Sequence, residues 1–209
     1  MEDVQAVQLR PGMYVGDTRD GTGLHNMLYA ALDNAVAEVL SGDASQVTVD
    51  LYSDGSCAVA DDGKGMPPVA PEGEARAIPE MLLTQLYFGI KHAVRTNRAS
   101  TIENTGLVPV NALSSWLDLR TARQGIEYLI RFESGRLARP LAPVAASERR
   151  LPMAQGTTIS FLPNANIFTP SAFDMETIGR AVRAIARSTG VEVALNDHRR
   201  RGESNAQSV

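Results

Sequence analysis

The feature that most constrains this 209-residue chain is a short acidic and glycine-rich run, Asp61 to Gly65. It follows an alternating stretch, from Cys57 to Asp62, that predicts a strand whose last residues deliver a carboxylate into the interior. The two glycines then allow a sharp turn and a close approach of the backbone to whatever lies there. Because a buried carboxylate is costly without donors, Asp61 must be paired internally or face a ligand that offers N–H groups. By itself, this pattern is more often a plain tight turn.

Composition limits the class of protein. A chain of 209 residues fits one domain of helices and strands, and its 44% hydrophobic and 21% charged residues are ordinary for a soluble globular protein. No apolar run approaches the length of a membrane helix. The formal net charge of -4 and the pI near 5.4 give no electrostatic footprint for nucleic acid, so we expect no direct DNA binding. The single cysteine and the absence of signal-peptide features predict a cytoplasmic protein.

A long helix is predicted from Thr22 to Ser41. Apolar residues recur along it at helical spacing and define one buried face: Leu24, Met27, Leu28, Ala31, Ala35 and Val39. Asn26, Ala30 and Asn34 follow one another at intervals of four and form a second column beside that face. Taken alone, Asn34 is more often an ordinary asparagine on the helix surface than a ligand residue.

The remaining patterns predict a sheet with further helices. We expect strands over 47–52, 57–61, 116–122, 126–132, 156–162 and 191–195, and helices over 78–88, 107–113 and from Met175 onward. Residues 10–17 and 67–74 read as loops, and the Ala-, Pro- and Arg-rich residues 135–154 as a loose connection. A domain over 10–198 would then follow a short lead-in, 1–9, and precede a disordered tail, 199–209. Lys64 is expected to pair with Glu38 on the long helix.

Several motifs occur in an order that resembles a known family. In chain order they are Arg10-Pro11-Gly12-Met13-Tyr14-Val15-Gly16-Asp17, Asp33-Asn34, the glycine turn, Gly106 with Val110-Asn111-Ala112-Leu113-Ser114, and Gly156-Thr157. This order resembles the ATP-binding domain of the B subunits of DNA gyrase and topoisomerase IV, within the superfamily that includes Hsp90 chaperones, histidine kinases and MutL. The resemblance spans roughly residues 8 to 200. It implies an α+β fold of the Bergerat type: a two-layer α/β sandwich with a mixed, largely antiparallel sheet and helices on one face.

The resemblance also implies an adenine site. In it, Asp61 accepts a hydrogen bond from the adenine amino group, and Gly65 lies near the base. Met66 and Pro67 form part of the pocket wall, and the Thr157 hydroxyl supports the Asp61 contact. The implied cofactor is ATP or ADP, with Mg²⁺ where phosphates are held.

Other residues match the family's phosphate end and pocket mouth. Asn34 corresponds to an asparagine that helps to hold Mg²⁺ against the phosphates. The lid, residues 89–106, would bring Lys91 and Gly106 to the phosphates. Arg123 corresponds to an arginine at the pocket mouth that also meets aminocoumarin inhibitors in gyrase, and a solvated hairpin arginine is its alternative.

The chain departs from the family where hydrolysis is performed. Ala30 stands where the family has the glutamate that activates the attacking water, so no catalytic residue is expected there, and Asn26 stands where a histidine is usual. The lid ends in Thr101-Ile102-Glu103-Asn104-Thr105-Gly106, whereas the family has three glycines in this stretch. Glu103 adds a negative charge near the phosphates, and two such charges 4 Å apart repel by about 4 kcal/mol at an effective dielectric of 20.

Three functions remain open from the sequence. The first is a stand-alone adenine-nucleotide-binding domain deficient in ATP hydrolysis. The second is a decoy or regulatory protein that binds a gyrase-type inhibitor or a topoisomerase partner. The third is an active, ATP-hydrolysing component of a topoisomerase.

Overall fold

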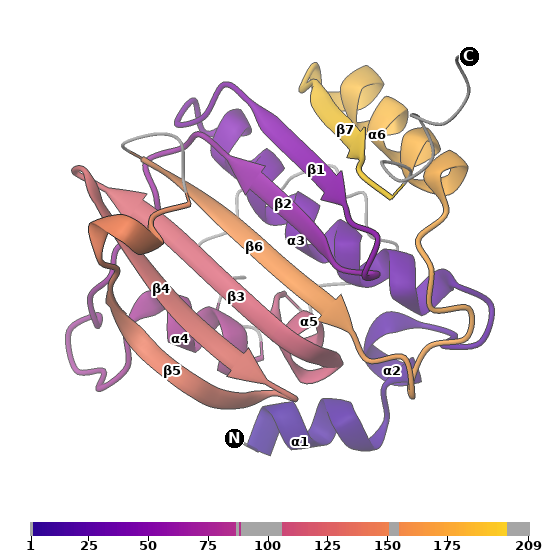
Figure 1. The fold of residues 1–209 in the computed structure, drawn as a ribbon, viewed down its shortest axis with the longest axis horizontal. Coiled ribbons are helices and arrows are strands. Elements are labelled where there is room, and N and C mark those ends of the chain that lie inside the picture. Colours follow the sequence, from indigo (N-terminus) through magenta and orange to yellow (C-terminus); the bar gives the residue numbers. More distant parts are fainter. Residues whose placement is uncertain (1, 87, 89–105, 151–154, 200–209) are drawn as a thin grey trace, which may run out of the picture.

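A computed structural model describes residues 2–86, 88, 106–150 and 155–199 (Figure 1). Its elements in chain order are α1 (Glu2–Leu9), α2 (Gly12–Val15), α3 (Thr22–Leu40), β1 (Val47–Leu51), β2 (Cys57–Asp61), α4 (Ile78–Thr84), α5 (Val108–Ala112), β3 (Ser114–Arg123), β4 (Ile126–Glu133), β5 (Arg136–Pro143), the 3-10 helix η2 (Ala146–Glu148), β6 (Gly156–Pro163), α6 (Met175–Thr189) and β7 (Val193–Asp197).

The strands form one seven-stranded sheet in the order β5-β4-β3-β6-β2-β1-β7. All neighbouring strands are antiparallel except β1 and β7, which run parallel. The turn between β3 and β4 has positive φ at Gln124 and Gly125, 53° and 77°, as a two-residue hairpin turn requires. The predicted fold, a mixed and largely antiparallel sheet, is confirmed.

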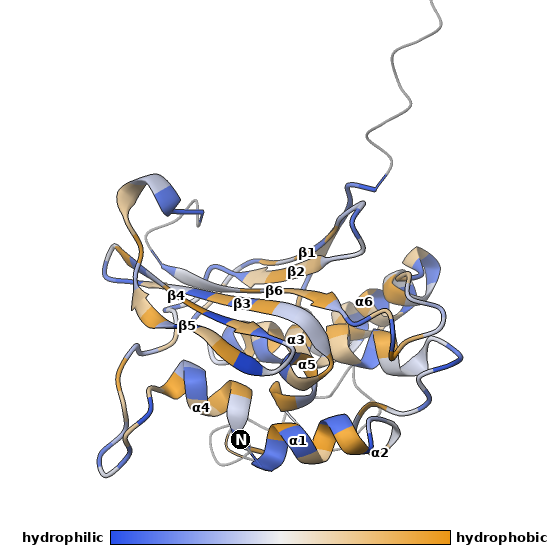
Figure 2. Cartoon of the chain, turned by 60° about the horizontal axis from the view of Figure 1, so that its bottom comes forward, coloured by the Kyte–Doolittle hydropathy of each residue, from blue (hydrophilic) through white to orange (hydrophobic). Residues whose placement is uncertain are grey.

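The helices cover one face of the sheet. Figure 2 shows α1, α3, α4 and α5 on the same side of the strands, while none of the described helices lies over the opposite face of β1, β2 and β6. The core lies between these layers, where Leu28 and Leu32 of α3 are fully buried in one cluster with Val49, Val59 and Phe161 of the sheet. The predicted long helix and its buried face are thus confirmed, although Val39 is only partly buried.

The first residues of the chain contribute to this core. The lead-in forms helix α1, whose Val4 and Val7 are buried, and the side chain of Gln8 donates hydrogen bonds to the carbonyl oxygens of Ala112 and Ser134, both at 3.0 Å. The predicted loop after it contains the short helix α2. Both elements are so short that their apolar periodicity gives little signal.

The prediction of a loose connection over residues 135–154 is wrong for its described part, and residues 151–154 lie outside the described residues. Residues 136–143 form strand β5, which pairs with β4 at the edge of the sheet, and residues 146–148 form η2. Pro140 and Pro143 lack the N–H group that a central strand would need, so an edge strand can accommodate them. The proline content that suggests a loop instead marks an edge.

Two predicted ends also shift. Helix α4 ends at Thr84, four residues earlier than expected, and β7 runs to Asp197. Arg199, the first residue of the predicted tail, donates hydrogen bonds to Asp197 and to the carbonyl oxygen of Phe173. Among the described helices, none has both the length and the apolar character needed to cross a membrane.

Candidate functional site

Asp61 is the last residue of β2, an interior strand that lies between β1 and β6. The residue is 5% exposed, and its Oδ1 accepts a hydrogen bond from the Gly63 amide at 2.9 Å. Burial raises the pKa of Asp61 to about 7, the neighbouring Glu38 and Asp62 carboxylates add to this rise, and the amides of Gly63 and Thr157 oppose it. The expectation that this strand delivers a carboxylate into the interior is confirmed.

The glycines around Asp61 are required by close packing within the protein. A Cβ atom on Gly65, whose φ is +73°, would lie 2.2 Å from the carbonyl oxygen of Ala122. A Cβ on Gly63 would lie 2.8 Å from Asp61 Oδ1 and 3.1 Å from Glu38 Oε2. The two glycines therefore allow the turn to pack closely against β3 and α3. The sequence alone could not distinguish this internal packing from a close approach to a ligand.

Strand β3 holds this turn by side-chain contacts. The hydroxyl of Thr121, a residue with no exposed surface, accepts a hydrogen bond from the Met66 amide at 2.6 Å and donates to the Met66 carbonyl at 3.3 Å. Arg123 is half-buried and donates from Nη1 to the carbonyl oxygen of Gly65 at 3.0 Å, so it contacts the turn. Sequence reasoning missed Thr121, although a threonine in the inward series of Leu117 and Leu119 is a signal.

Glu38, which the sequence suggested only as a partner of Lys64, lies on the face of α3 that meets the turn. Burial raises the pKa of its carboxyl, the Asp43 carboxylate raises it further, and Lys64 and Arg123 lower it. Lys64 forms its ion pair with Asp43, so the expected pairing with Glu38 is wrong. The reason is local: the chain turns back after α3, and the Asp43 amide donates to the Glu38 carbonyl at 2.9 Å.

The three residues at intervals of four along α3, namely Asn26, Ala30 and Asn34, have different surroundings. Asn26 is buried and donates from Nδ2 to the carbonyl oxygen of Val15 at 2.9 Å, which ties α3 to α2. Ala30 packs against the core as a partly buried methyl group. Asn34 is half-buried and lies one helical turn before Glu38.

A single amide oxygen suits Mg²⁺ only where phosphate oxygens and water complete the shell, because this ion is held by few protein oxygens at nucleotide sites. Asn34 offers one such amide oxygen and is half-buried. Within the described ranges, no group of three or more His, Cys, Asp or Glu side chains could hold a metal by itself.

The structure thus brings several predicted residues to one end of the sheet. Thr157 is buried and lies opposite Asp61 in the ladder between β2 and β6, Met66 is buried, and Pro67 is half-buried beside it. Gly106 precedes α5 with φ +64°. Lys91 and the remainder of the predicted lid, 89–105, lie outside the described residues.

A surface hollow of about 570 Å³ has a different lining and includes none of these residues. It is lined by Glu2, Asp3, Arg76, Thr84, Gln85 and Leu86.

Comparison with known proteins gives matches over nearly the whole chain. The B subunit of DNA gyrase from Rickettsia bellii is 39% identical over 201 residues, which are 95% of this chain and 24% of that protein. Its counterpart from Caulobacter vibrioides is 39% identical over 207 residues, 95% of this chain and 26% of that protein. The B subunit of DNA topoisomerase 4 from Enterococcus faecalis is 37% identical over 214 residues, 100% of this chain and 30% of that protein. No protein-family model matches.

A solved structure shares the fold. It is the 43K ATPase domain of Thermus thermophilus gyrase B, in complex with an aminocoumarin, with a TM-score of 0.79 and 31% identity over 94% of this chain and 49% of that one. The resemblance inferred from the motifs is therefore confirmed by both sequence and fold. The chain spans about a quarter of the length of the gyrase proteins it matches.

Proposed function

From the homology of this chain to the B subunits of DNA gyrase and topoisomerase IV, we propose that it is an adenine-nucleotide-binding domain that is deficient in ATP hydrolysis. The observation that carries the proposal is the burial of the Asp61 carboxylate and its raised pKa. Its carboxylate is almost fully buried at the end of a central strand, where burial raises its pKa to about 7. An acceptor that is so strongly desolvated is suited to a ligand that brings its own N–H donor, as the adenine amino group does.

The surroundings of Asp61 support adenine as that ligand. Thr157 lies directly opposite it in the sheet, and the turn that would flank the base is fixed by Thr121 and Arg123. In the bound complex, Asn34 would hold Mg²⁺ and Lys91 would meet the phosphates. The magnesium ion would neutralise phosphate charge, while this chain's own residues bind and orient the base.

The deficiency in hydrolysis rests on Ala30. The family's glutamate at this position takes a proton from the attacking water, and a methyl group has no atom that can do so. A positioned general base typically contributes about 100- to 10,000-fold to the rate. The proposed deficiency in ATP hydrolysis follows from this single side chain on α3.

Calorimetric titration with ADP, ATP and a non-hydrolysable ATP analogue, with and without Mg²⁺, tests the proposal. ADP and ATP should bind with similar, modest affinity, because the lid sequence lacks two of the family's three glycines. Binding of ATP a hundredfold tighter than ADP, about 2.7 kcal/mol, would contradict a weakened phosphate end.

A pair of matched variants locates the binding site. Asp61→Asn should abolish nucleotide binding, because an amide cannot match the carboxylate as an acceptor in this position. Asp62→Asn is the control. The Asp62 carboxylate accepts hydrogen bonds from the amides of Ser45 and Gln46, just before β1, so its replacement should leave nucleotide binding intact.

A decoy that sequesters an aminocoumarin is the second candidate function. The gyrase B domain that shares this fold was solved with such a compound, and here Arg123 stands at the edge of the turn next to Gly65. A compound present at 100 times its Kd stabilises the folded state by about 2.7 kcal/mol. For a chain of this length, that should raise the Tm by about 5 to 10 °C.

The same melting experiment separates the candidates. An increase with the aminocoumarin that is lost in Arg123→Ala supports the decoy. No increase with the aminocoumarin or with any adenine nucleotide would overturn both ligand proposals and leave contact with a topoisomerase partner as the function.

A further inference from the structure

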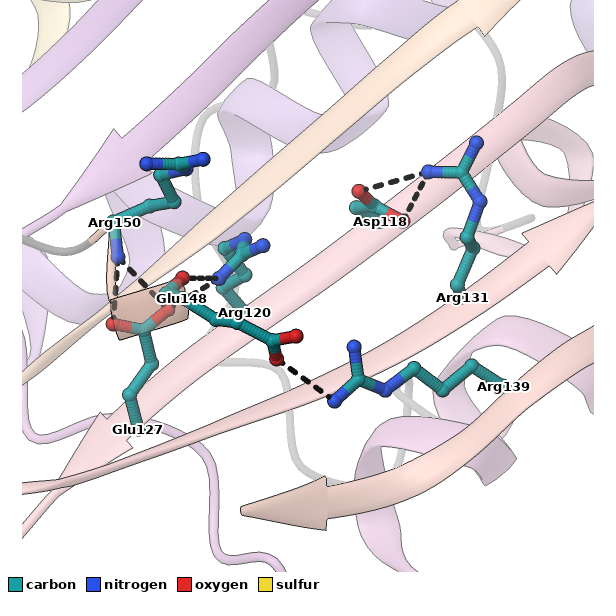
Figure 3. Close-up of polar contacts among 7 residues, drawn as sticks. All are labelled: Asp118, Arg120, Glu127, Arg131, Arg139, Glu148 and Arg150. Carbon is teal, nitrogen blue, oxygen red and sulfur yellow. Dashed lines mark hydrogen bonds and ion pairs between the residues drawn. The ribbon is translucent and has the colours of Figure 1, made fainter. Parts of the chain in front are cut away.

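An ion pair with a buried carboxylate lies on the face of the sheet that the α-helices do not cover. Glu127 of β4 is 3% exposed, and its Oε1 accepts a hydrogen bond from Arg120 Nη1 of β3 at 2.6 Å (Figure 3). The backbone amide of Arg150 donates to the same carboxylate, 3.1 Å from Oε2 and 3.3 Å from Oε1. A carboxylate on this face would ordinarily be solvated, so something must cover it.

The cover is the segment 144–150, here called the outer strap. Its first residue, Val144, is buried and donates from its amide to the Glu127 carbonyl at 2.9 Å. Arg120 also donates to the Glu148 carbonyl at 3.2 Å, and Arg139 pairs with the Glu148 carboxylate at 3.2 Å. Figure 3 shows these side chains converging from β3, β4 and β5. Glu127 and Arg120 therefore fasten the strap to the strands.

This pair lies directly behind the candidate adenine site. In the sheet, Ala122 has Glu127 as its lateral partner on one side and Gly156 on the other. The carbonyl oxygen of Ala122 is the atom against which Gly65 packs. The residues on either side of Ala122 are Thr121 and Arg123, which hold the glycine turn. One position of β3 thus connects the outer pair to the turn.

We propose that Glu127 is a positioning residue for the adenine site. Together with Arg120 and the amide of Arg150, it fixes the adjoining ends of β3 and β6, so that Thr121 and Thr157 meet the turn in one geometry. A buried charge whose partners are all in place can define an arrangement that a neutral side chain leaves loose. Binding groups need support of this kind to stay within about 0.5 Å of their productive positions. Where nucleotide is concerned, the inference rests on the proposed function.

The chain offers a matched control on the same two strands. Asp118 of β3 accepts two hydrogen bonds from Arg131 Nη1 of β4, at 3.0 and 3.1 Å, and the Arg131 guanidinium lies 5.2 Å from the centre of the Trp116 ring. Asp118 precedes Ala122 by four residues, which is about 13 Å along a strand. Asp118→Asn therefore removes the same charge from the same face at a distance from the turn.

The test compares Glu127→Gln and Asp118→Asn in the full chain, under conditions where both remain folded. ADP affinity is measured by calorimetry, and exchange of the Met66 and Thr157 amides is measured relative to the Val59 amide of the core. Glu127→Gln should weaken ADP binding at least tenfold and speed the relative exchange of both amides at least tenfold. Asp118→Asn should change each by less than twofold.

Equal effects of the two variants, or wild-type values in Glu127→Gln, would overturn the inference. If the wild-type chain binds no ADP, the proposed function fails while the exchange of Met66 and Thr157 still decides the positioning role. Should Glu127→Gln not fold, Arg120→Lys provides the milder change. It keeps the charge but loses the guanidinium that bridges Glu127 to Glu148, so it should show the same pattern at smaller amplitude.

Discussion

The two ends of the candidate nucleotide site differ in how completely they are built. At the adenine end, Asp61 accepts a hydrogen bond from the Gly63 amide and Thr121 accepts one from the Met66 amide. A Cβ atom on Gly65 would meet the carbonyl oxygen of Ala122. At the hydrolytic end, α3 presents the methyl group of Ala30 and uses Asn26 to contact α2. Recognition of a base and activation of water need different side chains, so one can persist without the other.

The largest expected effect concerns turnover. Steady-state, Mg²⁺-dependent phosphate release by this chain should be about 100- to 10,000-fold slower than that of an intact gyrase B ATPase domain, because Ala30 cannot act as a general base. Ala30→Glu alone should restore little, since the lid sequence also departs from the family. Turnover close to that of gyrase, if abolished by Asn34→Ala, would show that the hydrolytic end is intact and would contradict the proposed deficiency.

One added methyl group, at Gly65, should disrupt the packing of the adenine end. Gly65→Ala should lower the free energy of unfolding by about 3 to 5 kcal/mol, from overpacking and from strain at positive φ. Gly73→Ala is the matched control: its φ is +80°, but nothing lies within 4 Å of an added Cβ, so strain alone should cost about 1 kcal/mol. Urea denaturation of both variants measures the difference. Similar losses would show that contact with Ala122 is unimportant.

The raised pKa of Asp61 predicts opposite pH trends for stability and binding. The folded state keeps the Asp61 proton up to about pH 7, whereas the ordinary pKa of an aspartate carboxyl is 3.8. The folded chain therefore binds more protons between these values. The stability that Asp61 contributes is complete below about pH 4 and is lost as the pH rises through 7, by at most about 1.4 kcal/mol per unit.

Adenine recognition needs the ionised carboxylate, so ADP affinity should rise through the same window. Unfolding of the wild type and of Asp61→Asn at pH 5, 6, 7 and 8 isolates the stability effect, and ADP titrations at these values give the binding effect. Parallel stability curves for the two proteins would contradict a raised pKa.

The smallest effect is expected at the rim of the site. Lys64 and Asp43 form an ion pair in which the lysine side chain is 62% exposed. Such exposed pairs contribute about 0.2 to 1 kcal/mol, so Lys64→Ala should change the free energy of unfolding by less than 1 kcal/mol. ADP affinity should stay within twofold of the wild type. A large loss of ADP affinity would instead show that Lys64 contributes to nucleotide binding.

The elements that were predicted correctly have local signals. The period of α3, the alternation of β1 and β2, and Gly125 between β3 and β4 each lie within a short window of sequence. Helix α6 begins at Met175 as expected, and it is capped by the Asp174 carboxylate, which accepts a hydrogen bond from the Thr177 amide at 2.7 Å. Strand β5 was missed because its prolines resemble those of a loop until its place at the sheet edge is known.

The sequence by itself determined the order of most elements and the buried carboxylate of Asp61, because both depend on residue type and local period. The missing acid at position 30 followed from the family resemblance, which rests on the order of the motifs. Only the tertiary structure decided which residues surround that carboxylate. Thr121 is 55 positions from Met66, and Glu127 reaches the strap that covers it 23 positions later. Such contacts depend on strand register, since a shift by one residue turns every side chain to the other face.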